Sequence, residues 1–184
     1  MIFFTSDTHF GHANIIKYCS RPFSSVKEMD ETIIANWNAI VAPGDLVYHL
    51  GDFALASAGY TESILKRLNG QIHLCRGSHD KSALFPQCRK HFASVRTYQT
   101  VKRGGHYIFL SHCIHKVWHK SHHGSWHLFG HSHGGMDEYA ASEGKLLDVG
   151  VDSHNFTPLT LEQIEEIMNE RPLNFNDLNK RKGN

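Results

Sequence analysis

The sequence predicts an α/β fold in which parallel strands alternate with helices. Two observations support this fold class. Short apolar runs at 1–6, 45–52 and 71–76 are typical of buried strands, and apolar residues recur at helical spacing in the intervals between them. This strand–helix–strand–helix–strand order is typical of parallel βαβ units. The 184 residues suffice to bury one core, so we expect a single domain over residues 1–184.

The N-terminal elements follow from local signals. The run MIFFTS predicts the first strand, and HANIIKYC predicts a short helix that the Arg-Pro pair at 21–22 ends. Ser25 and Glu28 have the spacing of a capping box, and the helix behind them is expected to end at the Pro-Gly pair at 43–44. DLVYHLGD predicts the second strand, TESILKRLNG a helix that Gly70 ends, and QIHLCR the third strand.

The alternation changes from about Phe92. The segment FASVRTYQTVKRGGHYIFLSH predicts two strands joined by a KRGG hairpin. SWHLFGH and KLLDVGVD predict further strands, and Thr160 with Gln163 predicts the cap of a last helix, LEQIEEIM. The polar C-terminal stretch of about ten residues is expected to fray.

Composition excludes several classes of protein. Hydrophobic residues make up 40% and charged residues 20% of the chain, as in ordinary globular proteins, and the net charge is +1. The sequence therefore has no basic surface of the kind that binds long nucleic acid or membranes, but one small phosphorylated substrate needs only local charge. Cys19, Cys75, Cys88 and Cys113 form no C-x-x-C pair, which favours reduced thiols. With an N-terminal apolar run too short for a signal peptide, we expect a cytoplasmic protein.

Side chains that bind metals follow five predicted strands. Ligand sites of parallel α/β sheets lie beyond the carboxyl ends of the strands, so these residues can converge there. Singly, such an Asp is usually a turn or cap residue and such a His a hydrogen-bonded polar residue, but their joint occurrence favours a metal site. The residues are Asp7 and His9, Asp52, Ser78 with His79 and Asp80, His112, and His131 with His133.

The type and number of these residues indicate the metals. Asp and His suit divalent ions such as Mn, Zn or Fe. Six or seven ligands exceed the four of a structural zinc site, which suggests two ions with a bridging carboxylate. Asp7 and His9 are two positions apart, so on a strand they would share a face, and the same holds for His131 and His133.

The motifs SDTHFGH, GDFA, RGSHD, SH at 111–112 and GHSH resemble, in order and spacing, those of the calcineurin-like metallophosphoesterases. The resemblance covers roughly residues 2–152, and DTHFGHANIIKYCSRPF is similar to small, uncapped bacterial or phage members. It implies a four-layer α/β sandwich in which two mixed sheets are flanked by helices. It also implies two divalent metal ions, Mn first with Zn, Fe, Ni or Mg as alternatives, and attack on phosphorus by a metal-bound hydroxide.

The resemblance also implies a role for each residue. One ion would be held by Asp7, His9 and His133, the other by His112 and His131, with Asp52 as the bridge. His79 would be the catalytic histidine, which binds phosphate or protonates the leaving oxygen, and Asp80 would orient it. Ser78 departs from the family, which has Asn there as a ligand of the second ion. Its shorter hydroxyl implies a weakened second site or an impaired enzyme.

Residues beside the motifs have two interpretations each. His12 and Asn14 are candidates for substrate contact or for helix capping, and Arg21 for a phosphate contact or for an exposed charge. Five further histidines are expected to be loop or surface residues, and KSHHGS is expected to be a loop that borders the pocket. They are His115, His119, His122, His123 and His127.

The function that these observations favour is hydrolysis of a phosphodiester or phosphomonoester, with a nucleotide-type substrate favoured. The alternative is a weakened or silent member of the fold that serves as a scaffold for partners. Ser78 favours the alternative, and the presence of every other motif residue speaks against it. A nuclease acting on long nucleic acid is disfavoured by the near-neutral charge.

Overall fold

The structure is a computed structural model that describes residues 1–177. Most of the C-terminal stretch that was expected to fray, residues 178–184, lies outside the described part. Within that part, none of the helices has the length and apolar character that crossing a membrane requires.

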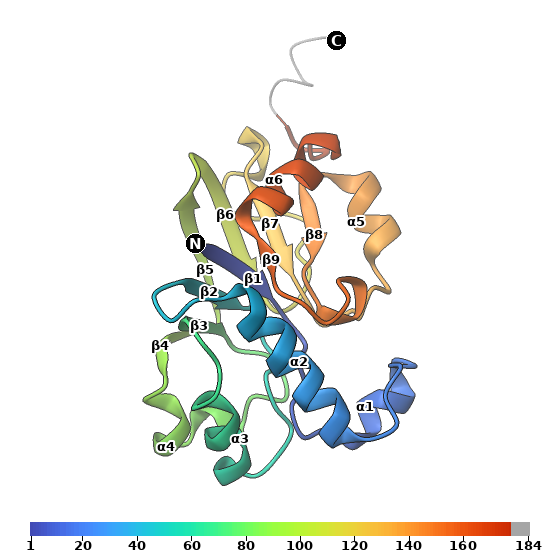
Figure 1. The fold of residues 1–184 in the computed structure, drawn as a ribbon. Helices are drawn as coiled ribbons and strands as arrows, with labels where there is room; N and C mark the ends of the chain where they lie inside the picture. The colour runs from blue at the N-terminus through green and yellow to red at the C-terminus, as the bar shows by residue number, and fades with distance from the viewer. Residues whose placement is uncertain (178–184) are drawn as a thin grey trace.

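The first sheet is mixed, with four parallel strands and one antiparallel edge strand (Figure 1). The βαβ units expected from the sequence build its parallel part. In order across the sheet the strands are β4 (Phe92–Arg96), β3 (Gln71–Cys75), β2 (Leu46–His49), β1 (Ile2–Thr5) and β9 (Leu159–Thr160), of which β9 is antiparallel to β1.

The second sheet is also mixed. Its edge strand β5 runs antiparallel to β6, and the remaining strands are parallel. In order they are β5 (Tyr98–Arg103), β6 (His106–Ser111), β7 (Trp126–Phe129) and β8 (Leu146–Asp148).

One strand expected from the sequence is in fact two. Residues 92–101 were expected to form a single strand before the KRGG turn, but β4 pairs with β3 in the first sheet, and β5, which extends to Arg103, pairs with β6 in the second. The chain changes sheets at Thr97, where no Gly or Pro marks a break. The pairing partners that separate the two strands lie elsewhere in the chain, so local sequence does not reveal the change.

Helices cover the outer face of each sheet, and the last helix packs against the core between the sheets. Ser25 caps α2, because its side chain accepts a hydrogen bond from the Glu28 amide. The Glu28 carboxylate accepts from Ser24 and not from the Ser25 amide, so the expected capping box is incomplete. Thr160 and Gln163 form the full capping box expected for α6. The helices are α1 (Ala13–Tyr18), α2 (Val26–Ile40), α3 (Ala58–Leu65), α4 (Pro86–Arg89), α5 (Asp137–Glu143) and α6 (Leu161–Glu170).

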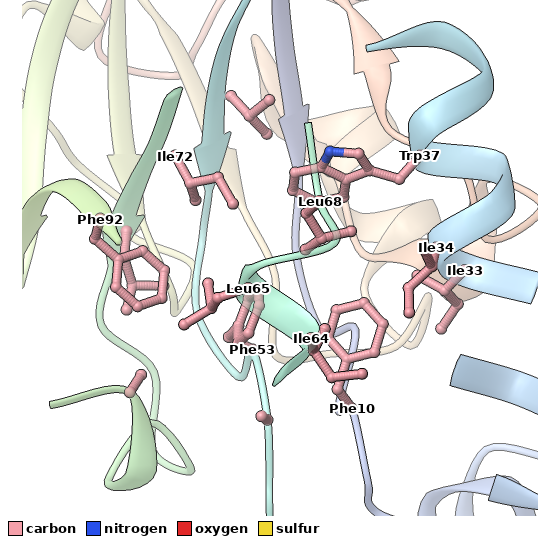
Figure 2. Packing of buried hydrophobic residues seen from close by; sticks show 14 of the residues in the cluster. Phe10, Ile33, Ile34, Trp37, Phe53, Ile64, Leu65, Leu68, Ile72 and Phe92 are labelled. Atoms are coloured by element: carbon pink, nitrogen blue, oxygen red, sulfur yellow. The ribbon is translucent and has the colours of Figure 1, made fainter. Parts of the chain in front are cut away.

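Alternating strand residues separate the layers, because successive side chains of a strand point to opposite faces. Phe3 packs with the helix layer of α2 and α3, as Figure 2 shows for neighbouring residues of that cluster, whereas Phe4 packs between the two sheets. In β7, Leu128 joins the core between the sheets and Phe129 joins the outer cluster with α5. Two mixed sheets flanked by helices therefore form a four-layer sandwich, as expected.

Candidate metal centre

The candidate metal ligands lie on tight turns just beyond the strands. Asp7 and His9 have φ of 57° and 50°, Asp52 has 54°, and His131 and His133 have 72° and 48°. Left-handed backbone at a residue other than Gly costs on the order of 1–3 kcal/mol and is concentrated at functional sites. The expected shared strand face is thus wrong for both D-x-H and H-x-H, because each pair lies on a turn after its strand.

Backbone amides hold one oxygen of each carboxylate in the centre. The His131 N–H donates to Asp7 Oδ2 at 2.8 Å, and the His79 N–H donates to Asp52 Oδ1 at 2.8 Å. Glycine permits these approaches, since a Cβ at Gly130 would lie 2.3 Å from Asp7 Oδ2 and one at Gly77 would lie 2.3 Å from Asp52 Oδ1. The other oxygen of each carboxylate is left to face the histidines.

The first cluster contains two buried polar atoms without a hydrogen-bond partner. Asp7 Oδ1 and His9 Nε2 are buried and unpaired, and they lie 3.9 Å apart, too far for a hydrogen bond. An unpaired buried polar group costs about 1–3 kcal/mol, so such atoms are uncommon. The gap is about twice a metal–ligand bond of roughly 2 Å. With His133, whose ligand atom lies within 4.8 Å of both, these residues fit a divalent cation.

The second cluster consists of Asp52, His112 and His131, whose ligand atoms lie within 4.8 Å of one another. His112 Nδ1 hydrogen-bonds the Leu50 carbonyl oxygen at 2.8 Å, so its Nε2 faces inward, 3.4 Å from Asp52 Oδ2 and 3.2 Å from His131 Nδ1. Asp52 Oδ2 is also 3.6 Å from His9 Nε2. That one oxygen therefore lies between the two clusters.

Asp152, which is ion-paired with the buried Arg21, positions His133. Its Nδ1 lies 2.7 Å from Asp152 Oδ2, a contact that leaves Nε2 for the cluster. Arg21 holds the same carboxylate from the other side, through Nε and Nη2 at 2.7 and 2.8 Å, and donates to the carbonyl oxygens of Asp7 and Thr8. Asp152 was not singled out from the sequence, although its place at the end of the run KLLDVGVD was a signal of the same kind as the others.

The pKa values of the candidate ligands are shifted in ways that suit the binding of metal cations in place of protons. Burial lowers the pKa of His9 to about 2, which keeps its imidazole neutral and available as a ligand. Burial also opposes charge on His112, but the neighbouring carboxylates of Asp52 and Asp7 outweigh it and raise its pKa to about 9. Burial raises the pKa of Asp7 as well. A centre without metal thus retains protons that divalent ions would replace.

Residues 1–103, more than half of the chain, match the family described as calcineurin-like phosphoesterase. The chain belongs to this family. An uncharacterized protein of Methanocaldococcus jannaschii is 37% identical over 172 residues, covering 91% of this chain and 90% of that protein.

A solved structure shares the fold. The crystal structure of a protein of unknown function from Aquifex aeolicus has a TM-score of 0.72 and 25% identity, covering 91% of this chain and 98% of that one. An archaeal phosphodiesterase has a TM-score of 0.42 and 19% identity, covering 70% of this chain and 71% of that one.

Ser78 and Asp80, the two neighbours of His79 in the chain, differ in their surroundings. Ser78 is exposed, with its Oγ 3.3 Å from Asp52 Oδ2, so its hydroxyl lies at the edge of the second cluster. The Asp80 carboxylate was expected to orient His79, but it instead accepts from the backbone amides of Asp52, Phe53 and Gly77. Asp80 therefore holds together the two loops that carry Asp52 and His79.

The expected substrate residues divide into one that lines the centre and two that do not. His12 caps no amide of α1, and its ring lies beside His9, with their Nδ1 atoms 3.3 Å apart. Asn14 is exposed and lies outside the hollow that His12 lines. Arg21 is neither an exposed charge nor free to reach a phosphate, because it is buried and its donors are engaged by Asp152, backbone carbonyls and Met29.

Two expectations about the other histidines were wrong. His127 is not a loop or surface residue: it is fully buried in β7, where its Nε2 accepts from the His115 amide. Burial lowers its pKa to about 3 and keeps it neutral. The KSHHGS segment does not border the metal centre but lines a separate hollow with His106 and Tyr107, at the opposite end of β6.

Proposed function

We propose that this protein is a dinuclear metal-dependent phosphoesterase that hydrolyses a phosphodiester or phosphomonoester, with nucleotide-type substrates favoured. The observation that carries the proposal is the pair of buried atoms, Asp7 Oδ1 and His9 Nε2, that face each other at 3.9 Å without a partner. Family membership supports the reaction class.

The proposed ligands are the residues of the two clusters. Asp7, His9 and His133 would hold one divalent ion, His112 and His131 the other, and Asp52 both, with the Ser78 hydroxyl at the edge of the second. When bound, the ions activate water and neutralise phosphate charge. Mn is the ion we favour, since Asp and His together suit it.

The surroundings of His79 support a role as general acid. Its side chain is 43% exposed, and its Nε2 is 3.9 Å from Asp52 Oδ2, so the imidazole lies beside the centre and reaches solvent. Its backbone N–H donates a hydrogen bond to Asp52, which holds the backbone of His79 in place beside the centre. We assign His79 to phosphate binding and to protonation of the leaving oxygen.

The test is hydrolysis of a generic monoester and a generic diester by protein stripped of metal and then supplied with Mn, Ni, Zn or Mg. We expect no turnover after chelation, a loss on the order of 10³-fold or more, because several kcal/mol of transition-state stabilisation leave with the ions. Mn should restore the rate. Hydrolysis that survives exhaustive chelation contradicts the proposal.

The same measurement distinguishes the proposed enzyme from the alternative, a silent member of the fold that serves as a scaffold. A silent member would still bind metal, shown by elemental analysis and calorimetry, yet hydrolyse neither ester with any ion. Ser78, the one departure from the family motif, is the feature that favours this alternative.

A further inference from the structure

Two hollows open on either side of the metal centre. One, of about 400 Å³, is lined by residues of the first cluster together with His12, Tyr18, Leu55 and His79. The other, of about 330 Å³, is lined by Arg76, Ser78, Tyr98, His112 and Cys113. His131 lines both, so the two hollows meet at the centre. A phosphate held at the centre would therefore have space for a substituent on each side.

Each hollow presents one exposed tyrosine. Tyr18, at the end of α1, is 73% exposed, and Tyr98, the first residue of the edge strand β5, is 61% exposed. Each ring is supported by one aromatic neighbour, Tyr18 by His12 at 6.2 Å and Tyr98 by Phe109 at 5.9 Å between ring centroids. Exposed aromatic rings beside a phosphate site are the surfaces on which nucleic-acid bases stack.

The pair of hollows distinguishes between ester classes. A phosphomonoester has one organic group and would occupy one hollow, whereas a diester has two. We propose that the substrate is a small phosphodiester of the nucleoside type, with an aromatic ring in each ester group stacked on Tyr18 and on Tyr98. This inference rests on the proposed phosphoesterase function and narrows its substrate class.

The position of His79 indicates which of the two ester groups leaves. His79 lines the hollow of Tyr18, so the leaving group occupies that side and the retained group lies beside Tyr98. Water forms the new bond to phosphorus and releases its proton to solvent. The phosphorus–oxygen bond on the Tyr18 side breaks, and the leaving oxygen takes a proton from His79. The products are an alcohol and a phosphomonoester, whose second negative charge the exposed Arg76 would favour.

The test varies only the retained group. p-Nitrophenyl phosphate, methyl p-nitrophenyl phosphate and thymidine 5′-(p-nitrophenyl phosphate) all release nitrophenolate but retain nothing, a methyl group or a nucleoside. With Mn²⁺ and the full chain, kcat/KM should be higher for the thymidine ester than for the methyl ester by about 5- to 150-fold, the range of base stacking on an aromatic side chain. The monoester should be the poorest substrate.

Variants then test which tyrosine is responsible for the preference for the thymidine ester. Tyr98→Ala should reduce the ratio of thymidine to methyl ester toward one, and Tyr98→Phe should retain it because the ring remains. Tyr18→Ala should raise KM for all three esters in common, since each carries nitrophenyl on the leaving side. Tyr139→Ala is the matched control: Tyr139 is 36% exposed on α5 and lines neither hollow, so the ratio should not change.

The outcomes separate the two proposals. If no ester is hydrolysed with any metal, the phosphoesterase function fails and this inference fails with it. If the monoester is the best substrate, or if Tyr98→Ala leaves a strong thymidine preference intact, the phosphoesterase function stands and the two-sided diester is overturned.

Discussion

The two clusters of the metal centre differ in how firmly the fold holds them. Asp7 and His9 are at most 1% exposed, and an ion pair of Asp152 with Arg21 supports His133 from behind. In the second cluster His131 is exposed, and Ser78, at its edge, is exposed as well. Asp52 and His112 are as buried as the first pair, so the two clusters differ mainly in their third ligand, which is part-buried and braced in the first and exposed in the second.

This difference has a consequence for metal binding. Ligands that are already positioned lose little conformational freedom when an ion binds, whereas exposed side chains must be ordered at that moment. We expect the first ion to bind tightly and the second more weakly, so that activity depends on the supply of metal to the exposed cluster.

Replacing His79 by Ala tests whether chemistry can be lost while both clusters stay intact. We expect turnover of an alkyl diester to fall by about 10²–10⁴-fold, because a general acid is removed. Metal content, measured by elemental analysis, should not change. A nitrophenyl ester, whose leaving group needs little protonation, is the control and should lose much less. Loss of an ion together with the imidazole would make His79 a ligand instead.

Replacing Asp152 by Asn weakens the more firmly held cluster. Metal affinity of the first site should fall about 10- to 100-fold, as for other residues that orient a ligand histidine. The protein should also lose about 3–5 kcal/mol of stability, since the buried Arg21 keeps its charge without a partner. Calorimetric metal titration and denaturant unfolding measure the two effects.

A matched control exists for that variant. Glu31 pairs with Arg67 at the surface, with side chains 51% and 43% exposed, so Glu31→Gln should change stability by no more than about 1 kcal/mol and leave metal affinity alone. Equal effects of the two variants would show that the Asp152 ion pair has no special role in holding His133.

Replacing Ser78 by Asn strengthens the weaker cluster and should have the smallest effect. The longer amide side chain brings a neutral oxygen donor toward the second ion, and we expect up to about a tenfold gain in its affinity. Turnover at limiting Mn should rise accordingly, and the difference should vanish at saturating Mn. Ser78→Ala is the control that removes the hydroxyl. Full occupancy of both sites in the unaltered protein at low metal, with no gain from Asn, would contradict the expected difference between the clusters.

Much of the fold follows from patterns that lie close together in the chain. The strands before Asp7, Asp52 and Gly77 and the helices between them are each determined by apolar periodicity and by caps such as Ser25. The candidate ligands follow for the same reason, because a polar side chain directly after a buried strand must lie at the edge of the sheet. Local sequence therefore sufficed to name the candidate ligands and the edge of the sheets at which they lie.

Only the tertiary structure decided how those residues are held. Arg21 and Asp152 are 131 positions apart, so neither local pattern predicts that the guanidinium is buried in a carboxylate pair. At the left-handed turn of Asp7, the His131 N–H donates to the Asp7 carboxylate, and the Asp7 N–H donates to the carbonyl oxygen of Gly51 in the second loop. Periodicity records which face of an element is apolar. It does not record which distant segment supplies the hydrogen bonds that make a strained turn stable, and at this centre those bonds join the two sheets.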